Sequence, residues 1–139
     1  MSIIDELLSN YEKYASTFDK GDLPIPPAKH VAVVTCMDTR LSPFVMLGLQ
    51  EGDAHIMRNA GGGITDDEIR SLVISQRLLG SQEIMLIQHT DCGMLTFSDL
   101  DENVRQSIAR IKTSPFVPNK DNVRGFVYGV QTGRLREVG

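Results

Sequence analysis

The sequence predicts an α/β fold, with a central, mostly parallel sheet of about four strands, an antiparallel edge strand, flanking helices and an N-terminal helical arm. Short apolar runs containing several β-branched residues occur at Val31–Val34 and Ile84–Ile87. Runs of this kind are typical of strands that are buried on both faces. Segments with helical periodicity alternate with the apolar runs and are joined to them by short links, which indicates parallel strands with crossover helices.

The N-terminal arm is predicted to be an amphipathic helix over residues 2–20, with Ser2 as the N-cap and Gly21 as the stop. A helix outside the first strand either covers its own sheet or reaches across to a second subunit, and the sequence leaves both possibilities open. The apolar residues that follow the three- and four-residue spacing of a helix are Ile3, Ile4, Leu7, Leu8, Tyr11, Tyr14, Ala15 and Phe18.

The remaining elements follow from local signals. A capping box at Thr65–Glu68 begins a helix that Gly80 ends, and Asp101 is suited to cap the next helix, which ends at Thr113–Pro115. The proline-rich link before the first strand is extended and stiff because proline restricts its own backbone and that of the residue before it. In chain order, we expect a strand at 29–35, a short helix at 41–48, strands at 54–58 and 83–88, and, after the capped helix, strands at 123–130 and 135–138.

Length and composition restrict the number of domains and the kinds of partner that we expect for the chain. The 139 residues predict one domain over 1–139, in which 1–21 form the arm. A net charge of −4 and a pI near 5.3 argue against a nucleic-acid partner. No apolar run approaches the ~20 residues of a membrane span, and the first residues lack the pattern of a signal peptide. We therefore expect a cytoplasmic protein without a membrane partner.

Polar residues appear where two predicted strands end. Cys36 follows the first strand, and His89 and Cys92 follow the strand at 83–88. In open α/β sheets ligands bind beyond the carboxyl ends of the strands, so these three side chains should converge. Two thiolates and one imidazole suit zinc and leave one coordination position free. The alternative is a disulfide between the two cysteines, whereas His30 and His55 lie near strand starts and are expected to be structural.

Asp38 and Arg40 follow Cys36 closely and form the second candidate feature. A guanidinium beside a carboxylate keeps it ionised and oriented, which suits a structural ion pair as well as a catalytic one. In the catalytic interpretation, Asp38 either accepts a hydrogen bond from zinc-bound water or occupies the fourth zinc position itself. A zinc-bound hydroxide in an apolar pocket can attack a small electrophilic carbon.

Three consecutive glycines follow the predicted strand at 54–58. The segment Asn59–Gly63 allows the backbone to approach a ligand closely, or else it is a flexible turn. It lacks the spacing of the glycine motifs that bind nucleotides. We therefore expect no nucleotide site there.

At these residues the sequence resembles the β-class carbonic anhydrases, in particular their short prokaryotic-type branch. The resemblance implies one Zn²⁺ per chain, held by Cys36, His89 and Cys92, and reversible hydration of carbon dioxide to bicarbonate and a proton. It also implies a homodimer or larger homo-oligomer in which the arm packs on a partner subunit. The pieces that carry the resemblance are Cys36–Arg40, Leu47–Gly62, His89–Gly93 and Val104–Arg110.

The resemblance also assigns roles around the metal. It implies that Asp38 and Arg40 form the catalytic dyad and that Gly61 and Gly62 lie beside the site. The chain departs from the branch at Thr96–Asp101, where relatives usually carry a longer segment that covers part of the site. The sequence thus leaves the shape of the pocket open.

Two other functions use the same residues. One is a zinc hydrolase acting on carbonyl sulfide or carbon disulfide, and the other is a non-catalytic, zinc-stabilised binding or regulatory module. Nucleobase deamination is excluded, since the chain lacks the H-x-E and P-C-x-x-C pattern of the zinc deaminases.

Overall fold

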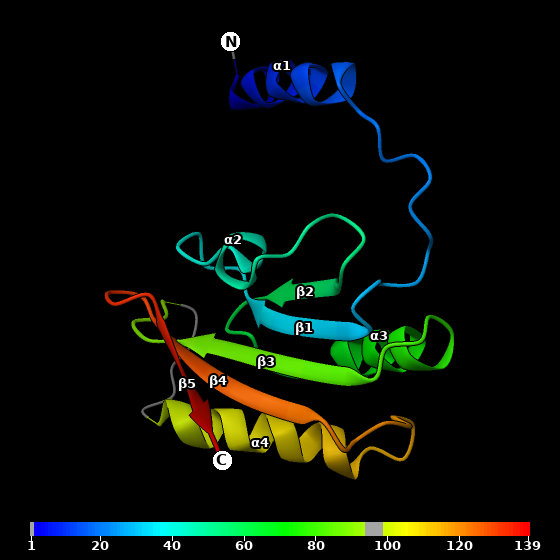
Figure 1. Ribbon diagram of the computed structural model, residues 1–139. Coiled ribbons are helices and arrows are strands. Elements are labelled where there is room, and N and C mark those ends of the chain that lie inside the picture. The colour runs from blue at the N-terminus through cyan, green and yellow to red at the C-terminus, as the bar shows by residue number, and fades with distance from the viewer. Residues whose placement is uncertain (1, 94–98) are drawn as a thin grey trace.

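A five-stranded sheet forms the body of the protein, whose computed structural model describes residues 2–93 and 99–139 (Figure 1). The strand order is β2-β1-β3-β4-β5; the first four strands are parallel, and β5 is an antiparallel edge strand beside β4. This arrangement confirms the predicted fold class. The strands are β1 (Val31–Cys36), β2 (His55–Asn59), β3 (Glu83–His89), β4 (Val123–Gly129) and β5 (Arg134–Val138).

Helices cover the two faces of the sheet unequally. The helices are α1 (Ile3–Ser16), α2 (Pro43–Leu47), α3 (Asp66–Arg77) and α4 (Leu100–Thr113). Helices α3 and α4 cover one face, and the short α2 lies over the other (Figure 1). Successive strand residues face opposite sides, so Val34 belongs to the larger core with Leu72 and Ile111, whereas Val33 belongs to a smaller core with Leu41 beneath α2. Burial on both faces explains the continuous apolar runs of the sequence.

Local caps set the ends of the helices. The predicted capping box of α3 is present. The N-cap of α4 is Asp99, whose side chain accepts a hydrogen bond from the backbone N–H of Glu102 at 3.0 Å, and not Asp101 as predicted. Asp101 instead pairs with Arg136 of β5 at 2.6 Å. Arg136 is far from Asp101 in the sequence, so only the folded sheet brings this pair together.

Two helices end earlier than the sequence predicts. Helix α1 ends at Ser16 because the N–H groups of Thr17 and Phe18 bond carbonyls three residues back, which tightens the last turn. Helix α3 ends at Arg77, and Gly80 lies in the link to β3 with a left-handed φ of +81°. A glycine in this conformation commonly follows a helix end.

Helix α1 stands clear of the sheet (Figure 1). None of its residues is buried, so it does not cover its own sheet. Its hydrogen bonds to the body converge on Glu51, which accepts from Tyr14 Oη at 2.8 Å, and Lys20 of the following link donates to the same carboxylate at 3.2 Å. The exposed apolar residues of the arm are Ile3, Ile4, Leu7, Leu8, Tyr11, Tyr14 and Phe18. Across the described residues, no helix has the length and apolarity needed to span a membrane.

Candidate active site

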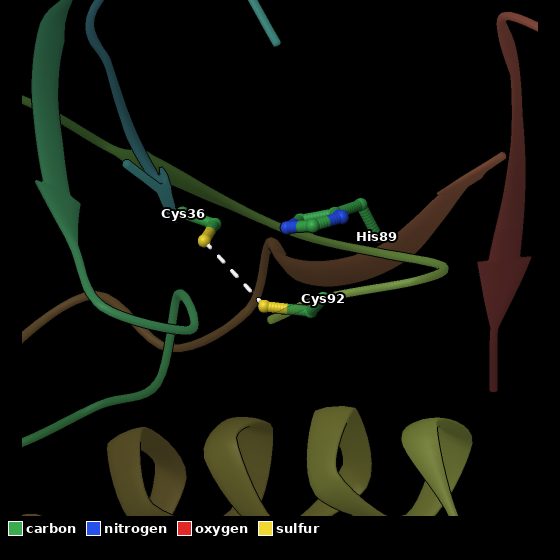
Figure 2. A group of neighbouring side chains, drawn as sticks. All are labelled: Cys36, His89 and Cys92. Atoms are coloured by element: carbon green, nitrogen blue, oxygen red, sulfur yellow. Dashed lines mark hydrogen bonds between the residues drawn. The ribbon is translucent and has the colours of Figure 1, made fainter. Parts of the chain in front are cut away.

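Two thiols and an imidazole meet at the carboxyl ends of β1 and β3 (Figure 2). Cys36 ends β1, His89 ends β3, and Cys92 follows three residues later. Because β1 and β3 are parallel neighbours, their ends lie at the same edge of the sheet. The three potential ligand atoms lie within 4.8 Å of one another. The two sulfur atoms are 3.8 Å apart, well beyond the ~2 Å of a disulfide bond, so both residues are thiols.

The imidazole of His89 is prepared to bind a metal through Nε2. Its Nδ1 lies 2.7 Å from the carbonyl oxygen of Thr90, which can only accept, so Nδ1 donates its N–H there and Nε2 is the nitrogen left for a metal. Nε2 is buried and has no hydrogen-bond partner among the described residues. Leaving a buried polar atom unpaired is costly, and a metal ion would supply the missing partner. Together with two thiols, this nitrogen forms a donor set that fits zinc and leaves one position open.

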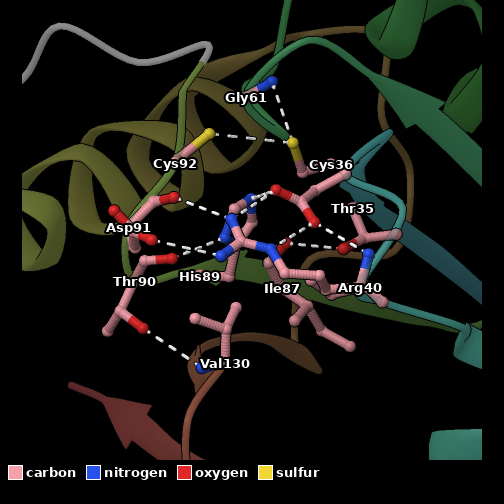
Figure 3. A network of polar contacts seen from close by, with 12 residues as sticks. Thr35, Cys36, Arg40, Gly61, Ile87, His89, Thr90, Asp91, Cys92 and Val130 are labelled. Atoms are coloured by element: carbon pink, nitrogen blue, oxygen red, sulfur yellow. Dashed lines mark hydrogen bonds and ion pairs between the residues drawn. The ribbon is translucent and has the colours of Figure 1, made fainter.

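The glycine segment is a fixed support for Cys36 and not a flexible turn. The backbone N–H of Gly61 donates to Cys36 Sγ at 3.3 Å (Figure 3). Asn59 Nδ2 donates both to the carbonyl oxygen of Gly63, at 2.8 Å, and to the Glu68 carboxylate. Hydrogen bonds thus hold both ends of the segment. An N–H that points at a thiolate stabilises its negative charge, which is the form that binds a metal.

Substitution of Gly62 by alanine is expected to destabilise the protein by about 2–4 kcal/mol, because it combines backbone strain with overpacking. Gly62 has a φ of +71°, and a Cβ atom there would lie 3.0 Å from the backbone nitrogen of Cys36 and 3.1 Å from the carbonyl oxygen of Ile87. Thermal or denaturant unfolding measures the effect. The matched control is Gly63→Ala, since a Cβ at Gly63 meets nothing within 4 Å. Equal stability of the two variants would contradict the expected close approach.

Asp38 and Arg40 form a two-sided ion pair beside the thiols. Arg40 Nε donates to Asp38 Oδ1 at 3.0 Å, and Arg40 Nη2 donates to Oδ2 at 2.7 Å. The side-chain hydrogen bonds from Arg40, followed by a bond from its backbone N–H, hold the pKa of Asp38 well below its usual range. Asp38 is therefore a carboxylate at neutral pH. Its Oδ2 lies 3.7 Å from His89 Nε2, so it faces the position that a metal would occupy.

Arg58 holds the segment 36–41, which carries Cys36 and Asp38, although the sequence alone suggested no role for it. Its guanidinium donates to the carbonyl oxygens of Cys36 at 2.9 Å, Asp38 at 2.8 Å and Leu41 at 3.0 Å. Three bonds to one short segment fix the backbone that carries Cys36 and Asp38. In the sequence, the only sign of this role is an arginine at the end of a largely apolar strand, and this does not identify the groups that it binds.

The other two histidines lie away from this edge of the sheet, as predicted. His55 begins β2, and its Nδ1 lies 2.6 Å from Ser75 Oγ. His30 precedes β1, and its carbonyl oxygen accepts bonds from the N–H groups of Gln82 and Glu83. Neither belongs to the cluster of potential metal ligands.

Comparisons with known proteins point to one family. The family model described as "Carbonic anhydrase" matches residues 31–103. The chain is 51% identical to Beta-carbonic anhydrase 1 of Mycobacterium tuberculosis, over 99% of both chains. It superposes on a carbonic anhydrase from Streptococcus mutans with a TM-score of 0.93 and 42% identity, covering 100% of this chain and 99% of that one. A carbon disulfide hydrolase from Acidianus sp. is 32% identical over 96% of this chain and 88% of its own.

The comparison also bears on the expected shortening of the chain. The alignment with the mycobacterial relative spans 162 positions, more than the 139 residues here, so that relative carries residues that this chain lacks. The expected place of the shortening, Thr96–Asp101, falls partly in 94–98, outside the described residues.

Proposed function

The chain belongs to the β-carbonic anhydrase family, whose reaction is the reversible hydration of carbon dioxide to bicarbonate and a proton. From this we propose a role for each residue of the site. Cys36, His89 and Cys92 hold one Zn²⁺ per chain. Asp38 orients the reacting water, and Arg40 holds Asp38. The observation that carries the proposal is the buried Nε2 of His89, which has no hydrogen-bond partner in the described part of the chain and lies beside two thiols and a carboxylate.

The donor set determines what the metal contributes. Zinc held by two thiolates and one imidazole is a Lewis acid that lowers the pKa of water at its open position toward neutrality. The chain assists by stabilising the ligands in the form that binds. The backbone N–H of Gly61 donates a hydrogen bond to Cys36 Sγ, and the backbone carbonyl oxygen of Thr90 accepts one from His89 Nδ1–H.

Asp38 serves as the hydrogen-bond acceptor for the reacting water. An ionised carboxylate only accepts hydrogen bonds, so it turns a water's O–H toward itself and an oxygen lone pair toward the substrate carbon. Arg40 engages both carboxylate oxygens of Asp38. The bonds from Arg40 fix the direction of the carboxylate, and Oδ2, which accepts one bond from Arg40, keeps a lone pair for the reacting water.

The oligomer is the second part of the proposal. We propose a homodimer or larger assembly in which α1 packs on a partner subunit, since its whole apolar face is exposed on this chain. A cytoplasmic location is also proposed, because a reducing compartment keeps both cysteines available as metal ligands.

Placing two acidic residues on the apolar face of α1, Leu7→Glu with Leu8→Glu, is expected to convert the assembly to monomers, because the buried charges would lose their hydration. Light scattering after size-exclusion chromatography measures the mass. Ser9→Glu with Asn10→Glu is the matched control, since it adds the same charge to adjacent positions of α1 outside the apolar stripe. An unchanged mass for the Leu7 and Leu8 variant would contradict the proposed role of the arm.

The proposed function is tested by stopped-flow carbon dioxide hydration on protein whose zinc content is known. About one zinc per chain is expected, with a rate that disappears on chelation and returns when zinc is restored. One zinc per chain without any rate would instead favour the binding module. Carbon disulfide, assayed on the same preparation, tests the other gas substrate.

A further inference from the structure

Arg40 is held by a second acidic residue on the side away from Asp38. We infer that Asp91 is a positioning residue, which anchors Arg40 and thereby keeps Asp38 in place beside the metal position. The inference rests on the roles proposed above for Asp38 and Arg40. Nothing in the sequence separated Asp91 from an ordinary loop residue between two metal ligands.

The hydrogen bonds of Arg40 divide between the two aspartates. Its Nη1 donates to Asp91 Oδ2 at 3.1 Å, and its Nη2 donates to the backbone carbonyl oxygen of Asp91 at 2.8 Å (Figure 3). Nε and Nη2 also serve Asp38, so all three guanidinium nitrogens are engaged. A planar group bonded on both sides cannot rotate about its long axis without breaking bonds to one partner.

Arg40 needs this second attachment because it is not buried. Its side chain is 44% exposed, whereas that of Asp38 is 9% exposed. At an exposed position, water competes for each donor and an isolated ion pair holds a long side chain weakly. A second pair of acceptors reduces the freedom of the guanidinium before the reaction begins, which is the usual function of a positioning contact.

The Asp91 side chain is itself 77% exposed, so the firmness of this contact comes from the backbone of Asp91. Its φ is +54°, a left-handed conformation that aspartate tolerates better than most residues do. The preceding residue is fixed to β4 and the turn after it, because the Thr90 N–H donates to Tyr128 and the Val130 N–H donates to Thr90 Oγ1. Asp91 thus ties Arg40 to the segment that carries His89 and Cys92, and the dyad keeps its distance from the metal ligands.

Removal of the Asp91 carboxylate should therefore leave Arg40 Nη1 without its partner and loosen Arg40 and Asp38, although the backbone carbonyl of residue 91 still accepts from Nη2. Asp91→Gly deletes the side chain without backbone strain, since glycine adopts positive φ freely. Asp91→Asn keeps the shape and one acceptor oxygen but loses the charge. Asp67→Asn is the matched control, because Asp67 also pairs with an arginine, Arg70, at an exposed position of α3.

The experiment measures kcat and KM for carbon dioxide, zinc content, and the solvent exchange of the Arg40 Nε–H by NMR. For Asp91→Gly we expect kcat to fall about ten-fold with KM nearly unchanged, zinc retained at the wild-type level and faster Nε–H exchange. Asp91→Asn should lose less activity than Asp91→Gly, and Asp67→Asn should match the wild type. The graded loss and the exchange rate are responses that a residue of merely structural importance would not produce.

Two outcomes would overturn the inference. One is an Asp91→Gly variant with wild-type kcat and unchanged Nε–H exchange. The other is loss of activity together with loss of zinc, which would show that Asp91 supports the segment carrying His89 and Cys92 and not Arg40. Failure of the underlying function is recognised separately, by Asp38→Ala. If that variant is inactive while Asp91→Gly is normal, only the inference about Asp91 is wrong.

Discussion

Replacement of Cys92 by serine is expected to abolish zinc binding and with it carbon dioxide hydration. A serine hydroxyl is a far poorer zinc ligand than a thiolate, and the remaining Cys36 and His89 would supply only two protein ligands. Structural zinc sites contribute on the order of 10 kcal/mol in small peptides, so the variant should also lose several kcal/mol of folding stability. Zinc analysis and thermal unfolding measure the two effects.

The appropriate reference for Cys92→Ser is the wild-type protein after removal of its zinc with a chelator. The two should unfold at similar temperatures, and added zinc should restore only the wild type. His30→Asn controls for a substitution at a histidine outside the site, and it should keep its zinc. A Cys92→Ser protein that retained one zinc per chain with full activity would refute the ligand assignment.

Replacement of Asp38 by alanine is expected to lower the rate of carbon dioxide hydration by about 10²-fold or more while zinc remains bound. Asp38 is the carboxylate that faces the metal position, with Oδ2 at 3.7 Å from His89 Nε2, and it is not needed to complete the set of three ligands. Loss of the acceptor would leave the reacting water without orientation. Stopped-flow kinetics and zinc analysis on one preparation separate catalysis from binding.

Asp101→Ala is a suitable control for Asp38→Ala. Asp101 also forms a two-sided pair with an arginine, Arg136, but it lies on α4 and, among the residues that the structure describes, has no hydrogen bond to the site. Its removal should leave the rate unchanged. If Asp38→Ala hydrated carbon dioxide at the wild-type rate across pH, the assignment of the dyad would be wrong, although the metal site itself could still be right.

Much of the site could be predicted because its chemistry is local in the sequence. Short apolar runs identified the strands, and polar residues directly after them identified the edge where ligands bind. Cys36, His89 and Cys92 were therefore expected together, as were Asp38 and Arg40. The mostly parallel sheet and its antiparallel edge strand also followed, since alternation of strands and helices restricts the topology, whereas the order of the strands within the sheet came only from the structure.

The tertiary structure decided which distant groups hold these residues in place. Three sets of contacts join segments that are far apart in the chain. They are the hydrogen bond from Gly61 N–H to Cys36, the hydrogen bonds from Arg58 to three carbonyl oxygens, and the ion pair of Asp91 with Arg40. Such contacts depend on strand register and on loop direction, which no local pattern encodes.

The arm shows the same division between sequence and structure. Its apolar stripe predicted a helix, because helical spacing is a property of neighbouring residues. Whether that stripe packs on its own sheet depends on the path of the proline-rich link, which the stripe does not encode. In the structure α1 lies away from the sheet, and Tyr14 and Lys20 bond to Glu51. The sequence by itself thus determined the elements and their chemistry, and the folded chain determined which surfaces and side chains meet, because meeting requires a geometry shared by residues that are not neighbours.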